Sequence, residues 1–119
     1  MKICFIPIDN RPVCYTLAKD IVSIDESIEL FIPPREYLGG LNKVADIEKL
    51  LNWLSLCPNP DAMIISLDTI AYGGLIPSRR SNETLEQIKT RIERLKQILI
   101  SKSTKVYCFC TFLFLILRR

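Results

Sequence analysis

Four short apolar runs, each ended by polar or turn-forming residues, constrain the fold of this chain most strongly. They cover residues 3–8, 28–32, 62–67 and 105–110. Runs of this length with almost no polar residue are typical of strands buried on both faces of a parallel sheet. Between consecutive runs lies a segment whose apolar residues recur every three or four positions, which is the spacing of one helix face. The alternation predicts parallel strands joined by right-handed crossover helices.

Three helices are expected between these strands. The first is expected from Val13, the second from an N-cap at Asn42, and the third over residues 85–99. The second helix is expected to place Val44, Ile47, Leu50, Leu51 and Leu54 on one face. After the third strand we expect a long loop, residues 69–81, that contains the pair Gly73-Gly74.

The fold class is therefore α/β, with a parallel sheet of about four strands and crossover helices. A sheet covered on both faces usually needs more chain than the 119 residues present here. We expect residues 1–119 to be a single incomplete α/β domain, the first part of a larger Rossmann-like or (β/α) barrel-like domain, with residues 111–119 as an aberrant or truncated tail. In a flavodoxin-like order the first and third strands are neighbours with ends about 5 Å apart, whereas a barrel order separates them by about 10 Å. We favour neighbouring strands.

Polar residues gather where these strands end. Parallel strands end at the same edge of the sheet, and α/β proteins bind ligands at that edge. The candidate catalytic residues are Asp9 and Asp68, each of which follows an apolar strand. The candidate substrate-binding residues are Arg11, Arg35, Glu36, Tyr72, Gly73, Gly74, Ser78, Arg79 and Arg80.

Each candidate also has a purely structural interpretation. A carboxylate at the end of a strand can act as a general acid or base, bind a divalent cation or hold a sugar hydroxyl, but it can equally cap a helix or a turn. The pair Gly73-Gly74 can present N–H groups to an anion or form an ordinary turn. Arg11 can face a substrate, pair with Asp9, or do both.

The composition excludes several kinds of chemistry. The chain contains no histidine, so it cannot assemble a Ser-His-Asp triad or the usual histidine-containing zinc sites. Its five cysteines form no C-x-x-C pair, which indicates reduced, structural thiols. No phosphate-loop or dinucleotide motif is present, and we expect no cofactor. Asp9, Glu36 and Asp68 offer oxygen ligands for Mg²⁺ or Ca²⁺, but we expect no tightly bound transition metal.

Charge and hydropathy suggest which partners the protein has. The net charge of +3 comes with no basic stripe interleaved with aromatic residues, so we expect no nucleic acid. The first apolar run is too short for a signal peptide, which favours the cytoplasm. The apolar stretch at residues 106–117 is about half the length that spans a membrane, so no membrane is expected. We expect a small-molecule ligand or substrate, and self-association through the exposed C-terminal strand.

Three motifs resemble a known family. They are IPIDNRPVCY at residues 6–15, PPREYLGG at residues 33–40 and SLDTIAYGGLIPSRR at residues 66–80. Together they are similar to the opening of the bacterial proteins of the family called domain of unknown function 4127, over roughly residues 1–110. The resemblance implies a considerably longer parent protein with no settled activity, so it assigns no residue a role. The chain departs from the family pattern at residues 112–119.

The leading hypothesis is that the parent protein is a cytoplasmic enzyme acting on a small polar or anionic substrate. Two carboxylates, Asp9 and Asp68, would suit a hydrolase of the glycosidic type, with arginines to orient the substrate. The alternatives are a ligand-binding or regulatory domain without turnover, and an inactive truncated remnant.

Overall fold

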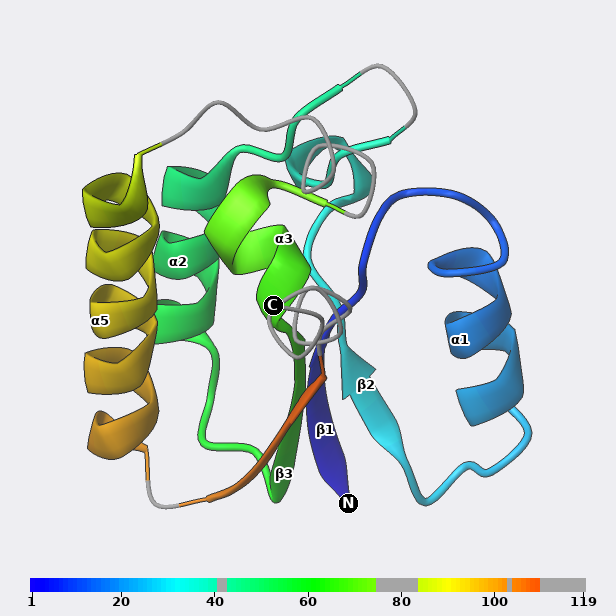
Figure 1. Cartoon of the computed structure of the whole chain (residues 1–119). Helices are drawn as coiled ribbons and strands as arrows, with labels where there is room; N and C mark the ends of the chain where they lie inside the picture. The colour runs from blue at the N-terminus through cyan, green and yellow to red at the C-terminus, as the bar shows by residue number, and fades with distance from the viewer. Residues whose placement is uncertain (41–42, 75–83, 103, 110–119) are drawn as a thin grey trace.

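A computed structural model of the chain contains a parallel sheet with helices on both sides (Figure 1). It describes residues 1–40, 43–74, 84–102 and 104–109. The strands are β1 (Lys2–Ile6), β2 (Glu29–Phe31), β3 (Ala62–Ser66) and β4 (Lys105–Phe109). The helices are α1 (Thr16–Val22), the 3₁₀ helix η1 (Arg35–Tyr37), α2 (Ile47–Leu56), α3 (Leu67–Tyr72) and α5 (Leu85–Ser101). The α/β class and the parallel sheet of four strands are confirmed.

The strand order in the sheet is β2-β1-β3-β4. β1 lies between β2 and β3 and pairs parallel to both, with Ile3 opposite Leu30 on one side and Ala62 on the other. The expectation that the first and third strands are neighbours is confirmed. This order is that of a doubly wound, Rossmann-like sheet, whereas a barrel keeps its strands in sequential order.

The core lies on one face of the sheet. α2, α3 and α5 lie on that side, whereas α1 lies on the other (Figure 1). Alternate residues of β1 and β3 point into the core, because successive side chains of a strand face opposite sides. Those fully buried on the strands are Cys4, Ile6, Met63 and Ile65, and they pack with Leu50, Leu51, Leu54 and Leu95 from the helices.

The first two predicted helices begin later than the sequence predicts. Residues 11–15 form a turn in which the N–H groups of Cys14 and Tyr15 both donate to the carbonyl oxygen of Arg11, so α1 starts at Thr16 rather than Val13. α2 starts at Ile47, and its N-cap is Asp46, whose carboxylate accepts from the N–H of Lys49 at 3.1 Å. The predicted cap Asn42 lies outside the described residues.

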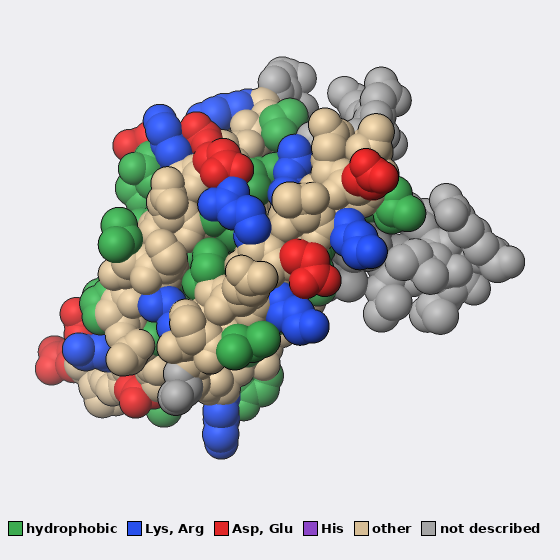
Figure 2. All heavy atoms as spheres, turned by 90° about the vertical axis from the view of Figure 1, so that its left-hand side faces the viewer, with side chains coloured by type: hydrophobic (Ala, Val, Ile, Leu, Met, Phe, Trp, Pro, Cys, Tyr) green, Lys and Arg blue, Asp and Glu red, His purple; other side chains and the backbone are tan. Residues whose placement is uncertain are grey.

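α5 matches its prediction most closely. Thr84 and Gln87 form a reciprocal capping box at its start, with side chain to backbone distances of 3.1 and 3.2 Å. Figure 2 views the molecule from the side on which α5 lies, and there basic and acidic side chains are interspersed. Within the described ranges, no helix combines the length and apolar character needed to cross a bilayer. The predicted tail, residues 111–119, lies outside those ranges.

Candidate functional site

The segment after β1 builds an ion pair at the carboxyl edge of the sheet. The side chain of Asp9 is buried, and its Oδ1 accepts from the backbone N–H of Arg11 at 3.0 Å. Oδ2 accepts from Nε of Arg11 at 2.7 Å and lies 2.7 Å from Nη2. Charge-assisted hydrogen bonds of this kind are short and strong, and they fix the orientation of the guanidinium. The Arg11 side chain remains 36% exposed, so it lies between the buried carboxylate and solvent.

The second candidate carboxylate, Asp68, follows the neighbouring strand. The structure corrects the predicted loop at residues 69–81, because its first residues belong to the short helix α3. Ser66 caps this helix by accepting from the N–H of Thr69 at 3.4 Å, and Asp68 is fully buried in the first turn. A helix of six residues is too short to show helical periodicity in the sequence.

Thr69 connects the two aspartate segments. Its Oγ1 lies 2.7 Å from the carbonyl oxygen of Pro7 and 3.1 Å from that of Ile8, so the hydroxyl donates to the backbone just before Asp9. Thr69 is itself fully buried. The start of α3 is therefore bonded directly to the segment that carries Asp9. Asp9 and Asp68 lie on contacting segments, as the strand order predicts.

The pair Gly73-Gly74 ends α3. Gly73 has φ +89°, the left-handed conformation that favours glycine at the end of a helix. The N–H of Gly73 donates to the carbonyl oxygen of Thr69 and that of Gly74 to the carbonyl oxygen of Asp68. Of the two interpretations of this pair, the structure favours the turn, because both N–H groups are used within the fold.

Arg35 holds the same segment from the other side. Its Nε and Nη2 donate to the carbonyl oxygen of Asn10 at 2.9 and 2.7 Å. The guanidinium also lies 5.2 Å from the centre of the Tyr15 ring, within cation–π range. Burial raises the pKa of Tyr15, whose hydroxyl donates to the carbonyl oxygen of Pro33 at 2.9 Å. Arg35 therefore supports the backbone next to Asp9.

Cys14 belongs to this group, although the sequence indicated only structural cysteines. Burial raises the pKa of its thiol, and the hydrogen bond and charge of Asp9 raise it further, whereas Arg11 lowers it. The three side chains are therefore close neighbours. The spacing could have revealed this, because Arg11 and Cys14 are the first and last residues of a turn whose central residues are Pro12 and Val13.

A polar cleft with a volume of about 620 Å³ opens where η1, the start of α2 and α5 meet. Its charged lining residues are Glu36, Lys43, Asp46, Glu48, Lys49 and Arg91. Of these, only Glu36 was a candidate from the sequence. Arg91 comes from α5, and its Nη1 donates to the carbonyl oxygen of Ala71 at 2.8 Å. Arg91 is far from Glu36 along the chain, so sequence reasoning could not place the two in one cleft.

The remaining candidates divide into two groups. Tyr72 is half-buried at the end of α3, whereas Ser78, Arg79 and Arg80 lie outside the described residues. In the part of the chain that the structure describes, no group of three or more carboxylates or cysteines could hold a metal ion. The oxygen set of Asp9, Glu36 and Asp68 is therefore not assembled there.

The family model described as "Protein of unknown function (DUF4127)" matches residues 3–114 of the chain. The chain belongs to DUF4127. This confirms the resemblance carried by the three sequence motifs, all of which fall inside the matched range. A comparison with curated proteins and another with solved structures each gave no match. Membership of DUF4127 brings no activity with it, so a functional argument depends on the geometry described above.

Proposed function

We propose that this chain recognises the anionic or polar group of a small molecule at the carboxyl edge of its sheet, as the substrate-binding part of a cytoplasmic enzyme. The observation that carries the proposal is the Asp9–Arg11 pair. A buried carboxylate holds Nε and Nη2 of a guanidinium whose side chain is still 36% exposed. An arginine preoriented in this way can offer its remaining N–H donors to a carboxylate or phosphate.

The same geometry separates the roles of the two aspartates. Asp9 accepts hydrogen bonds from Arg11 on both oxygens, so its charge is already matched. It suits a positioning role better than proton transfer. Asp68, which is fully buried in the first turn of α3, is the carboxylate that we keep as the candidate for proton transfer, because α3 is bonded to the Asp9 segment through Thr69. The reaction class that fits a carboxylate beside an orienting cation is hydrolysis, including hydrolysis of the glycosidic type.

Anion recognition is tested by thermal shift with three separate probes: inorganic phosphate, acetate and glucuronate. A probe that binds the native state raises the melting temperature by an amount that grows with its concentration over Kd. At least one probe should stabilise the wild-type chain and should stabilise Arg11→Lys much less, because an ammonium cannot keep the forked geometry. Arg94→Lys is the matched control, since Arg94 is similarly exposed at 41% and pairs with Glu48 on the surface. Equal shifts in the two variants would contradict the role of Arg11.

Turnover is tested separately with a panel of 4-nitrophenyl glycosides and esters. For a substrate that is hydrolysed, Asp68→Asn should abolish turnover while affinity stays within about tenfold, because a catalytic group acts mainly on the transition state. Circular dichroism should show that the variant folds. Unchanged turnover in Asp68→Asn would refute the catalytic assignment. Anion binding without turnover of any substrate would instead favour the non-catalytic alternative.

A further inference from the structure

Two cysteines far apart in the sequence meet in the core, away from the carboxyl edge. Cys4 lies in the middle of β1, and Cys57 follows the last residue of α2. Their sulfur atoms are 3.0 Å apart, and both residues are buried, with exposed fractions of 0% and 7%. Both are free thiols. A disulfide needs the sulfurs about 2.05 Å apart, so they would have to approach by only about 1 Å.

A buried lysine lies beside the pair. Lys102 is only 8% exposed, and its Nζ donates to the carbonyl oxygens of Cys57 at 2.8 Å and Ser55 at 3.3 Å. These carbonyls belong to the carboxyl end of α2, where a positive charge is favourable. Among the described residues, both hydrogen-bond partners of this ammonium are backbone carbonyls, so no carboxylate neutralises it. An ammonium in such surroundings stabilises a nearby thiolate.

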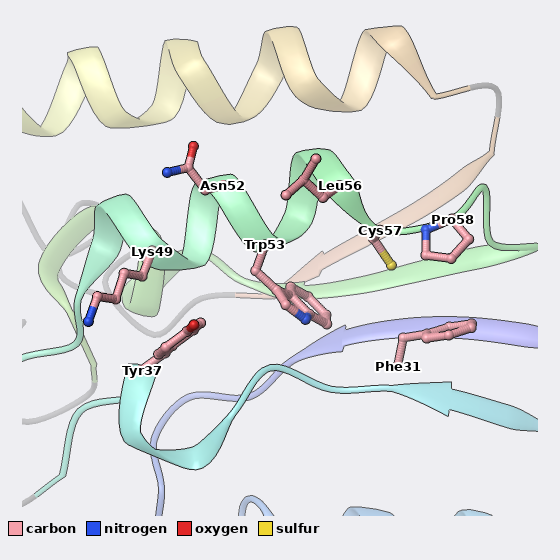
Figure 3. A pocket seen from close by; sticks show the side chains of 8 residues that line it. All are labelled: Phe31, Tyr37, Lys49, Asn52, Trp53, Leu56, Cys57 and Pro58. Atoms are coloured by element: carbon pink, nitrogen blue, oxygen red, sulfur yellow. The ribbon is translucent and has the colours of Figure 1, made fainter.

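The two thiols differ in access. Cys57 lines a cleft with a volume of about 400 Å³, together with Phe31, Trp53 and Pro58. In Figure 3 the sulfur of Cys57 and the Trp53 ring lie on the same side of α2, whereas Leu56 points the other way. Cys4 lies behind Cys57 and is closed to solvent. Burial raises the pKa of Cys4 far above its ordinary value, and its contact with Cys57 raises it further, while Lys102 lowers it. A small reagent therefore meets Cys57 first.

We propose that Cys4 and Cys57 form a redox-active pair that a small peroxide in this cleft converts to a disulfide. The Cys57 thiolate attacks one oxygen of hydrogen peroxide, the O–O bond breaks, and hydroxide leaves to give a sulfenic acid at Cys57. The Cys4 sulfur then attacks the Cys57 sulfur, the S–O bond breaks, and the departing hydroxide takes the Cys4 proton. Two thiols and one peroxide thus give one disulfide and two waters. The sulfurs lose two electrons and the peroxide gains them.

The disulfide would close a loop that spans α1, β2 and α2. Cross-linking a loop of this length restricts the unfolded chain, and we expect the melting temperature to rise by about 10 °C. Dithiothreitol should reverse the rise. The cross-link would join β1, an interior strand of the described sheet that precedes the Asp9 segment, to the end of α2.

The test treats the full chain with hydrogen peroxide and maps disulfides by mass spectrometry without reduction. Wild type should lose two titratable thiols of its five and yield a Cys4–Cys57 linked peptide. Cys14→Ser, the matched control, should yield the same link, because Cys14 lies in the turn before α1. Cys57→Ser should lose the link and the rise in melting temperature. Cys4→Ser gives a second test if Cys57→Ser does not fold.

Two outcomes would overturn the proposal. One is a chain whose Cys4 and Cys57 stay reduced while peroxide oxidises Cys14. The other is a link from Cys57 to a cysteine other than Cys4. Lys102→Met tests the ammonium separately from the closeness of the two sulfur atoms. Removing the ammonium should slow disulfide formation between Cys4 and Cys57 by on the order of tenfold. An unchanged rate in that variant would refute the role of Lys102 in the pair.

Discussion

Gly39 is the position where one added methyl group should disturb the candidate site most. A Cβ on Gly39 would lie 2.3 Å from the carbonyl oxygen of Gly73, 2.8 Å from that of Lys43 and 3.0 Å from the N–H nitrogen of Ala45. All three are backbone atoms, which cannot rotate away. The carbonyl oxygen of Gly39 also accepts from the N–H of Asn10 at 2.8 Å. Gly39→Ala should therefore push apart the end of α3, the residues before α2 and the segment next to Asp9.

The expected size of the effect follows from these contacts. The N–H of Ala45 donates to the carbonyl oxygen of Gly73 at 3.0 Å, and losing that hydrogen bond costs about 1 kcal/mol. Overpacking a buried site adds about 1–3 kcal/mol. With about 2.1 cal/mol/K per residue, the unfolding entropy of a chain this long is about 0.25 kcal/mol/K. A loss of about 2–4 kcal/mol thus lowers the melting temperature by about 8–16 °C.

The assay is thermal unfolding followed by circular dichroism, with Gly40→Ala as the matched control. The three atoms that would lie nearest a Cβ on Gly40 all belong to the side-chain amide of Asn10, with its oxygen at 2.8 Å, and that amide can rotate. We expect Gly40→Ala to cost no more than about 1 kcal/mol, or about 4 °C. If the two variants melt within about 2 °C of each other, the backbone contact between Gly39 and Gly73 does not constrain this site.

Two further predictions concern the Cys14 thiol and the edge strand β4. At fixed pH, Cys14 should react faster with iodoacetamide in Asp9→Asn than in wild type, because the carboxylate of Asp9 is one cause of the raised pKa of the Cys14 thiol. A slower reaction would contradict the contact between Asp9 and Cys14. β4 is an edge strand of the described sheet with Tyr107 58% and Phe109 41% exposed, and we expect the chain to self-associate through it. Replacing both residues by lysine should then lower the molar mass measured by size-exclusion chromatography with light scattering to that of a monomer. Ile24→Lys, at an exposed position outside the sheet, should leave the oligomer unchanged, and an oligomer that survives both β4 substitutions would refute self-association through β4.

The regular elements could be predicted because each carries its own local pattern. The strand at 62–67 is a continuous apolar run, and the structure gives β3 within one residue of it. Leu50, Leu51 and Leu54 repeat at helical spacing, and all three are fully buried in α2. The neighbouring placement of β1 and β3 follows from the preferred topology of βαβ units rather than from any residue.

Elements that depend on distant contacts could not be predicted. α3 is too short for a periodic pattern, and it is stabilised by the hydrogen bonds of Thr69 to Pro7 and Ile8, which lie more than sixty residues away. The first helix has the opposite problem. Leu17 and Ile21 recur at helical spacing, yet they are 47% and 58% exposed, and no residue of α1 is buried. Periodicity shows which face is apolar but not whether a neighbour covers it.

The candidate site shows the same division between local and distant information. The ion pair between Arg11 and Asp9 could be predicted, because the two residues stand only two positions apart in a turn. Its consequence was not foreseeable, because a strand-end aspartate predicts catalysis only while its oxygens are free for a substrate. In the structure both oxygens of Asp9 accept from Arg11, so the group that the pair presents to solvent is the guanidinium rather than the carboxylate. The ligand that we propose for this edge is therefore an anion, bound through Arg11.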